Sequence, residues 1–304
     1  METQRGLIIG GCGFIGSNIV NLLDHEWTVV DDLSLGVREN LQKGTHFRKL
    51  SADEINWGVG QGNYDFIMLQ HGPSSNPMFY PDPYAAIEKH TLGAVRVFDF
   101  ARRVGINKVI YASTSSLYGN TPGLQSEDSP IRPPNFYSVA KRAIEDVARV
   151  YWDAYGISSF GFRYFSVYGA NEGHKGEYAN IITQFLWRLL DGEPPIIYGN
   201  GKQTRDFTHV KDVVDANKRA IDSCRAGAFV LNVGTGKAAS FNRVADLLND
   251  EMHMTILPQY VPNRINNYVN DTLADTRLAK EVLGFESKVD LGEGVKRLIA
   301  AYTL

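Results

Sequence analysis

The chain has 304 residues, 43% of them hydrophobic, and a formal net charge of −3, a composition typical of a folded globular protein. This slightly acidic balance gives no broad attraction to phosphate backbones, so no nucleic-acid partner is predicted. The two cysteines, Cys12 and Cys224, cannot build a disulfide framework and favour a reducing compartment. No run approaches the roughly 18 apolar residues of a membrane span, and no signal-peptide pattern is present. A cytoplasmic protein without a membrane partner is expected.

In the first half of the chain, short apolar runs alternate with longer amphipathic stretches, which predicts repeated strand-helix-strand units and a parallel sheet. Strands are expected at residues 6–9, 27–30, 66–69, 108–112 and 158–163, and helices at residues 15–23, 83–104 and 137–155. Beyond residue 165 the alternation fades into Gly- and Pro-rich connections. The predicted fold class is therefore α/β: a Rossmann-type doubly wound parallel sheet at residues 1–165, with a smaller, mixed α/β C-terminal part at residues 166–304 that shares one cleft with it.

The loop after the first predicted strand is rich in glycine and opens a helix. Gly10, Gly13 and Gly16 form a G-x-x-G-x-x-G pattern that includes Phe14 and Ile15. Glycines in such a loop allow a tight turn, close approach of a pyrophosphate and close packing of helix on strand. The free N–H groups and positive dipole end of the helix then hold the phosphates. Taken alone, the loop is equally well read as a flexible glycine turn.

Acidic residues follow the second predicted strand. Asp31 and Asp32 lie about 20 residues after the glycine loop, where a carboxylate can accept the hydroxyls of an adenosine ribose. Asp31 would also repel a 2′-phosphate, so NAD is favoured over NADP. Asp53 follows a possible third strand and either reaches the adenine or is a solvated loop acid.

Tyr137 and Lys141 lie one helical turn apart on the same face of the predicted helix at residues 137–155. A neighbouring cation stabilises a phenolate, so the pair predicts a tyrosine whose pKa is lowered and which acts as a general acid and base. With 15 tyrosines, about one such spacing is expected by accident. The strand end at residues 113–116 adds hydroxyl groups at the edge where open α/β sheets bind their ligands.

These features resemble the extended short-chain dehydrogenase/reductase family, in particular its NAD-dependent nucleotide-sugar epimerase/dehydratase branch. The resemblance covers nearly the whole chain. The motifs that carry it occur in this order: the glycine loop, Asp31-Asp32-Leu33-Ser34-x-Gly36, the Ser/Thr strand end with Leu117-Tyr118-Gly119, Tyr137-x-x-x-Lys141, Arg163-Tyr164-Phe165-x-x-Tyr168-Gly169 and Arg205-Asp206-Phe207-Thr208-His209-Val210.

The resemblance implies roles for individual residues. Tyr137 is the catalytic acid/base, Lys141 holds the nicotinamide ribose, and Thr114 is the hydroxyl partner, with Ser115 as the alternative if the register shifts by one. Residues 1–165 are implied to bind NAD, through Gly10, Gly13, Phe14, Ile15, Gly16, Asp31, Asp32, Leu33, Ser34, Gly36, Asp53, Gln70, His71, Gly72, His90, Tyr137, Lys141 and Phe165. The substrate is implied to contact Thr114, Ser115, Ser116, Ser166, Asn180, Tyr198, Arg205 and Arg264.

Arg205 would pair with the substrate diphosphate, a task suited to a planar and permanently charged fork. Without the motif it would be read as a solvated surface arginine.

The departures from the family pattern reduce the number of candidate reactions. Ser116 occupies a position where dehydratases and decarboxylases of the branch usually carry an acid, and a hydroxyl without an activating partner is a poor proton shuttle. This change favours epimerisation. His71, His90 and Ser166 also replace family residues; the histidines are new functional groups or, as the more frequent case, packing and hydrogen-bonding groups.

The resulting expectation is an NAD-dependent nucleotide-sugar 4-epimerase that acts on a UDP-hexose, such as UDP-glucose/UDP-galactose or their N-acetyl forms, through a transient 4-keto sugar. The alternatives are a 4,6-dehydratase, a reductase, an epimerase at another carbon, or a dinucleotide-binding protein without catalysis. A homodimer through the helices at residues 83–104 and 137–155 is implied, and no metal site is predicted.

Overall fold

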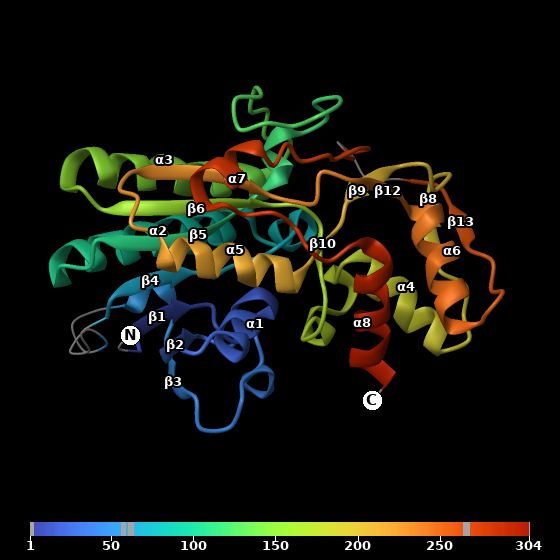
Figure 1. Ribbon diagram of the computed structural model, residues 1–304, viewed down its shortest axis with the longest axis horizontal. Coiled ribbons are helices and arrows are strands. Elements are labelled where there is room, and N and C mark those ends of the chain that lie inside the picture. The colour runs from blue at the N-terminus through green and yellow to red at the C-terminus, as the bar shows by residue number, and fades with distance from the viewer. Residues whose placement is uncertain (1–2, 56–58, 60–63, 264–267, 304) are drawn as a thin grey trace.

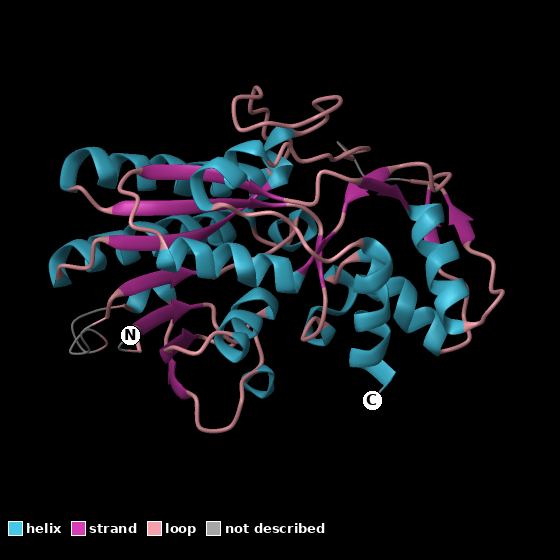
Figure 2. Ribbon diagram, in the orientation of Figure 1, coloured by secondary structure: helices cyan, strands magenta, loops and turns pink. Residues whose placement is uncertain are grey.

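The computed structural model describes residues 3–55, 59, 64–263 and 268–303. A larger part holds a parallel sheet between two layers of helices, and a smaller part, which ends with the C-terminal helix, packs beside it (Figures 1 and 2). The carboxyl ends of the strands point toward the smaller part, so the junction between the two is the place where a ligand crevice is expected.

The sheet has seven strands in the described residues, in the order β11-β6-β5-β4-β1-β2-β3, and every pairing is parallel. Its strands are β1 (Arg5–Ile9), β2 (Glu26–Asp31), β3 (His46–Lys49), β4 (Phe66–Leu69), β5 (Lys108–Thr114), β6 (Ser158–Tyr164) and β11 (Ala228–Val233). This order confirms the predicted Rossmann-type doubly wound sheet. The five predicted strands all form, and their ends differ from the prediction by two residues at most.

Helices cover both faces of the sheet. One face is covered by α2 (Pro83–Val104) and α3 (Phe136–Tyr155), and the other by α1 (Phe14–Leu22), α5 (Val210–Asp222) and α7 (Arg277–Leu283). Successive residues of β1 serve the two faces in turn, since Leu7 and Ile9 belong to the core under α2 and α3, whereas Ile8 belongs to the core under α1 and α5. Burial on both sides explains why the predicted strands are continuous apolar runs.

The two long helices begin and end at recognisable signals. The side chain of Asp82 accepts a hydrogen bond from the backbone N–H of Ala85, Pro83 follows as the first helical residue, and Gly105 ends α2 with a left-handed φ of 78°. Asn135 caps α3 in the same way through the N–H of Ser138. This cap fixes the position of the residues in the first turn of α3.

Segments beyond residue 165 return to the large sheet. After β6 the chain forms β7, α4, β8, β9 and β10 of the smaller part and then comes back as α5 and β11, and β11 pairs with β6 from Ala228 to Val233. The larger layer therefore contains residues on both sides of the predicted boundary. The sequence signal was missed because this strand-helix-strand unit is interrupted by a long excursion of the chain between β6 and α5.

The smaller part is mixed α/β, as predicted. Its short strands pair as β7 with β10, β8 with β13 and β9 with β12. Its elements are β7 (Val167–Tyr168), α4 (Ile181–Leu190), β8 (Ile196–Tyr198), β9 (Thr204–Asp206), β10 (Thr208–His209), β12 (Ala238–Ser240), α6 (Phe241–Met252), β13 (Gln259–Val261) and α8 (Leu291–Thr303). They enclose a separate core that includes Ile182, Phe185, Leu248 and Leu298.

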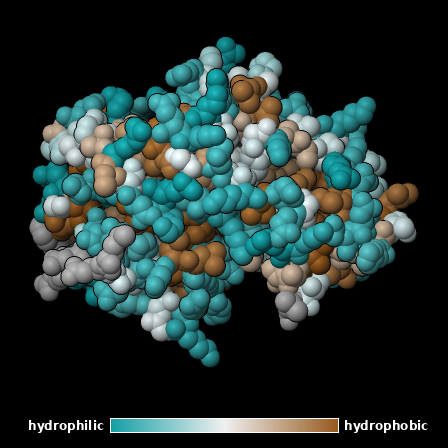
Figure 3. All heavy atoms as spheres, viewed as in Figure 1, coloured by the Kyte–Doolittle hydropathy of each residue, from teal (hydrophilic) through white to brown (hydrophobic). Residues whose placement is uncertain are grey.

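On the face shown in Figure 3, hydrophilic residues cover most of the surface and hydrophobic groups are interspersed among them. None of the helices in the described residues has the length and apolar character needed to cross a membrane.

Candidate active site

A cavity of about 920 Å³ lies at the carboxyl ends of the strands, between the two parts of the molecule. This volume is at the upper end of the roughly 300–1,000 Å³ found for small-molecule sites. Residues of the smaller part close the cavity on its other side. The predicted site residues in its wall are Gly13, Phe14, Ile15, Gly16, Leu33, Ser34, Gly36, Gln70, His71, Gly72, Thr114, Ser115, Ser116, Tyr137, Lys141, Ser166, Asn180 and Arg205.

The glycine loop has the shape of a phosphate cradle. Helix α1 starts at Phe14, and its N-cap, Gly13, has no side chain to satisfy the first N–H groups. No acidic residue stands in its first turn. A Cβ added at Gly16 would lie 2.2 Å from the carbonyl oxygen of Gly10, so the close packing of helix on loop requires glycine there. The site therefore offers free donors and room for an anionic group.

Asp31 is bonded to the backbone of the same loop. Its carboxylate accepts hydrogen bonds of 2.9 Å from the backbone N–H groups of Cys12 and Leu33. Burial raises the pKa of Asp31. Neither Asp31 nor Asp32 is in the cavity wall, and Asp32 pairs with Lys89 of α2. Asp53 lies in the 3₁₀ helix Ala52–Glu54, also outside the wall.

The structure brings Tyr137, Thr114 and Lys141 to one wall. Thr114 is the last residue of β5, and Tyr137 is the second residue of α3. The Thr114 hydroxyl, and not that of Ser115, acts on the pKa of the Tyr137 phenol, which favours Thr114 as the hydroxyl partner. Burial raises the pKa of Tyr137 to about 12, and the Thr114 hydroxyl opposes this shift. The predicted lowering of the tyrosine pKa is therefore wrong for the protein without ligands, because desolvation of the phenolate dominates.

Lys141 is 4% exposed, and its ammonium group donates a hydrogen bond of 2.9 Å to the carbonyl oxygen of Ala112 in β5. Burial lowers its pKa to about 7. At neutral pH the lysine is thus only partly charged. A neutral tyrosine and a partly charged lysine keep isolated charge in the buried wall low, and the tyrosine has to lose its own proton before it can accept another.

His71 and His90 stack on one another behind the same wall. Their ring centroids are 5.0 Å apart, and the Nε2 atom of His71 lies 3.2 Å from the carbonyl oxygen of His90. A Cβ at Gly72 would lie 2.0 Å from the Nδ1 atom of His90, so this glycine makes room for the ring. Burial lowers the pKa of His71 to about 4. The two rings therefore form a stacked pair, in which neither ring nitrogen of His90 has a hydrogen-bond partner among the described residues.

The loop after β4 presents polar atoms that no described residue satisfies. Gln70, Ser75 and Asn76 line the cavity, and each has a buried side-chain oxygen without a hydrogen-bond partner in the described part of the chain. Buried polar atoms of this kind are expected where a ligand or water completes the bonding. Ser75 and Asn76 were missed from the sequence, although they follow the carboxyl end of a predicted strand, where ligands of such sheets bind.

Arg205 stands at the end of the cavity formed by the smaller part. Its guanidinium group lies over the rings of Phe241 and Tyr268, and it donates hydrogen bonds to the carbonyl oxygens of Val269 and Asn270. It is therefore a held, partly buried cation and not a solvated one. A substrate diphosphate would share these donors with the backbone carbonyls.

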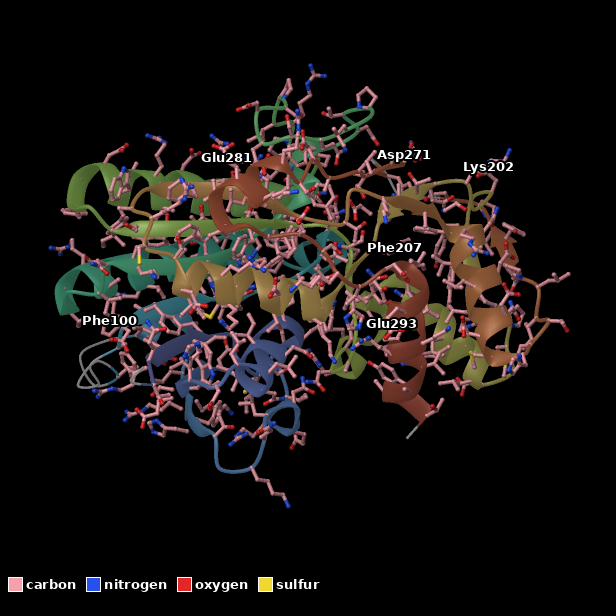
Figure 4. The ribbon with its side chains drawn as sticks, viewed as in Figure 1. Phe100, Lys202, Phe207, Asp271, Glu281 and Glu293 are labelled. Carbon is pink, nitrogen blue, oxygen red and sulfur yellow. The ribbon has the colours of Figure 1, made fainter. Side chains whose placement is uncertain are left out.

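The other predicted substrate residues divide between several places. Asn180 lines the cavity and also caps α4 by accepting from the N–H of Ile182. Tyr198 lines a second cavity of about 410 Å³, together with Lys202 and Asp271. Figure 4 shows these last two residues along the upper edge of the smaller part. Arg264 lies outside the described residues.

Gly10, His90 and Phe165 are also absent from the cavity wall. Phe165 is fully buried and packs with Tyr118 and Ala274. Among the described residues that line the cavity, sequence analysis missed Lys175, Tyr178 and Tyr268. Lys175 and Tyr178 belong to a short 3₁₀ helix, Gly173–Tyr178, and Tyr268 belongs to a loop, and neither segment has a periodic pattern to place it.

The chain is similar to known proteins in sequence. The model of the family described as "NAD dependent epimerase/dehydratase family" matches residues 6–234. The chain is 31% identical over 308 residues to UDP-glucose 4-epimerase of Mycolicibacterium smegmatis, covering 97% of each.

Two solved structures are also similar. The UDP-N-acetylglucosamine 4-epimerase from Methanobrevibacter ruminantium, in complex with UDP-N-acetylmuramic acid, superimposes with a TM-score of 0.93 at 28% identity, with 99% of both chains covered. The UDP-glucose 4-epimerase of Thermotoga maritima, with UDP-glucose, also gives 0.93, at 29% identity with 98% of both chains covered.

Proposed function

Because the chain belongs to the NAD dependent epimerase/dehydratase family, we propose that it is a nucleotide-sugar 4-epimerase that acts on a UDP-hexose. The observation that carries the proposal is that Thr114, Tyr137 and Lys141 share the wall of one cavity with the glycine loop. An acid/base group thus shares one chamber with a dinucleotide cradle, and epimerisation at a carbinol carbon needs both.

The residues present fit NAD. The uncapped start of α1 and the tight glycine contacts suit its diphosphate, and Asp31 stands at the end of β2 next to the loop. The unpartnered oxygen of Gln70 is a further acceptor in the wall. When bound, NAD supplies a reversible acceptor for the hydride of the sugar carbon.

The chain's own residues handle the proton. The oxygen of Tyr137 takes the proton of the sugar 4-hydroxyl as that carbon is oxidised to the ketone, and it returns the proton when the ketone is reduced from the opposite face. Thr114, which lines the same wall and whose hydroxyl acts on the phenol, orients Tyr137. Lys141, one turn further along α3, supplies a cation that favours the phenolate once bound ligands hold its proton in place. No net acid or base is consumed in the cycle.

Two features support epimerisation over the other reactions of the branch. Ser116 stands in the cavity wall where a dehydratase or decarboxylase needs a second proton donor. Asp31 disfavours the 2′-phosphate that a reductase using NADPH would bring. The relatives named above are 4-epimerases of UDP-glucose and UDP-N-acetylglucosamine, which supports a UDP-hexose as the substrate.

The direct test is product analysis. Purified full-length protein is incubated with NAD and, separately, UDP-glucose and UDP-N-acetylglucosamine, and the sugar is examined by proton NMR. Appearance of the C4 epimer with no change in mass supports the proposal. A product lighter by one water would identify a dehydratase, and tight NAD binding without any product would favour a binding protein.

We also propose a homodimer formed through α2 and α3, which pack against each other. Both helices expose large apolar side chains, including Leu92, Val139 and Val150. A second copy covering this surface would remove them from water. Sedimentation of the wild type as a dimer, and of a Leu92→Asp/Val150→Asp variant as a monomer, is the expected result.

A further inference from the structure

The segment from Ala170 to Lys175 crosses from the smaller part to the cofactor end of the cavity. The side chain of Asn18 donates to the carbonyl oxygen of Ala170 at 2.9 Å, and the side chain of Asn171 donates to the Ser17 hydroxyl at 3.3 Å. Both partners are in α1, the helix whose start forms the phosphate cradle. These bonds hold the segment against that helix.

Lys175 is fixed within this segment by a buried acid. Glu172 is fully buried, and its carboxylate accepts hydrogen bonds from the backbone N–H of Asn180 at 2.7 Å and from the hydroxyl of Thr183 at 2.7 Å. It also accepts from the ammonium group of Lys175 at 2.8 Å. The acid therefore stands behind the cavity wall with its bonds satisfied, and it determines where the lysine points.

The ammonium group of Lys175 faces the start of α1. It lies 5.2 Å from the centre of the Phe14 ring, and both residues line the cavity. The Lys175 side chain is 14% exposed, so a bound anion there would be only weakly screened by solvent. An ammonium group has three N–H donors, and the bond to Glu172 uses one of them.

The other cations of the described cavity wall are Lys141 and Arg205. Lys141 donates to Ala112 beneath the catalytic wall, and Arg205 is held at the far end by residues 269 and 270. Neither contacts the start of α1 in the described structure. Glu177 also lines the cavity but is exposed, so solvent screens its repulsion of an anion more than it screens the attraction of the half-buried Lys175.

We propose that Lys175 is a further binding residue, whose ammonium group contacts a diphosphate oxygen of a nucleotide bound in this cavity, opposite the N–H groups of α1. The inference rests on the proposed function, because it requires nucleotides in the cavity. The diphosphate belongs either to the cofactor or to the nucleotide sugar, and its position next to Phe14 favours the cofactor. Lys175 and α1 then hold the same group from two sides.

The test compares affinities of the cofactor-free, full-length protein and its variants by calorimetry, with ADP-ribose, UDP and uncharged adenosine as probes. Lys175→Met keeps the length of the side chain but removes its charge. Loss of one charge-assisted hydrogen bond is expected to weaken ADP-ribose binding by about tenfold or more, with adenosine unchanged. Lys175→Arg is expected to retain most of the affinity. Lys218→Met, which removes an exposed lysine of α5 paired with Asp222, is the matched control without effect.

If Lys175→Met loses affinity for UDP and not for ADP-ribose, the result also supports the proposal and assigns the contact to the substrate. Equal affinities of the Met variant and the wild type for both diphosphates would overturn it, as would an equal loss for adenosine, since that indicates a distorted site. A second readout is the salt dependence of ADP-ribose binding, which should be weaker in Lys175→Met than in the wild type. If the wild type binds no NAD at all, it is the proposed function that fails.

Discussion

Lys141 donates its hydrogen bond to the carbonyl oxygen of Ala112, and this bond holds the lysine of α3 against β5 while its charge is buried. Burial lowers the pKa of Lys141 from 10.5 to about 7. Between these two values the unfolded chain binds a proton that the folded chain does not. The free energy of unfolding therefore falls as the pH is lowered from about 10.5 to 7. Near pH 7 the destabilisation caused by burying the charged lysine reaches its full size.

Replacing Lys141 with methionine should accordingly stabilise the cofactor-free protein while abolishing its activity. We expect a gain on the order of 2 kcal/mol at pH 7, because the relief from desolvation exceeds the loss of one hydrogen bond. The gain should shrink toward pH 10. Urea unfolding of Lys141→Met, of the wild type and of Lys218→Met at a series of pH values measures it. If the free energies of unfolding of the wild type and of Lys141→Met change with pH in the same way, burial of Lys141 does not destabilise the protein.

A second prediction concerns Gly72 and His90. A methyl group at Gly72 would overlap the His90 ring, and the backbone φ of 88° is also unfavourable for alanine. We expect Gly72→Ala to cost about 2–4 kcal/mol of folding free energy, from overlap and backbone strain together. In a His90→Ala background the overlap disappears and only the strain of about 1–2 kcal/mol remains. A double-mutant cycle without any coupling would mean that the ring is not held where the structure places it.

The third prediction concerns Glu145 of α3, which forms a buried two-point ion pair with Arg163 of β6. The Nη2–Oε2 distance is 2.8 Å, and the Ser113 hydroxyl also donates to this carboxylate, at 2.6 Å. Glu145→Gln should cost about 3–5 kcal/mol, because it leaves the arginine charge buried and unpaired. Asp146→Asn, one residue further along, breaks an exposed pair with Arg142 and should cost less than about 1 kcal/mol. Similar losses for both variants in thermal unfolding would contradict this account.

The sheet and its first three helices were predictable because their signals are local. The Asp82-Pro83 start and the Gly105 end gave α2 its bounds, and alternating apolar runs placed the central strands. Strand β11 was not predictable, because its pairing with β6 depends on a long excursion of the chain. The same holds for Lys175: its partner Glu172 is only three residues away, but Phe14 and the start of α1 are brought to it by the fold.

Tyr137 and Lys141 lie in the cavity wall, but the predicted lowering of the tyrosine pKa was wrong. The Tyr137–Lys141 spacing indicates contact between a phenol and an amine, and says nothing of how deeply both are buried. Burial raises one pKa to about 12 and lowers the other to about 7, so the protein without ligands keeps the proton on the tyrosine. How strongly solvent is excluded from a side chain depends on the packed chain. For this reason the sequence analysis predicted the wrong direction for the pKa shift of Tyr137.

Epimerisation by Tyr137→Phe, measured beside the wild type with the UDP-hexose that the wild type converts, tests the central claim most directly. The variant loses only the phenolic oxygen, so its affinity for NAD should stay within about twofold, while the rate of C4 inversion should fall by about 10²–10⁴-fold, the usual contribution of a general acid/base. Full epimerase activity in Tyr137→Phe would show that another group moves the proton, and would contradict the account.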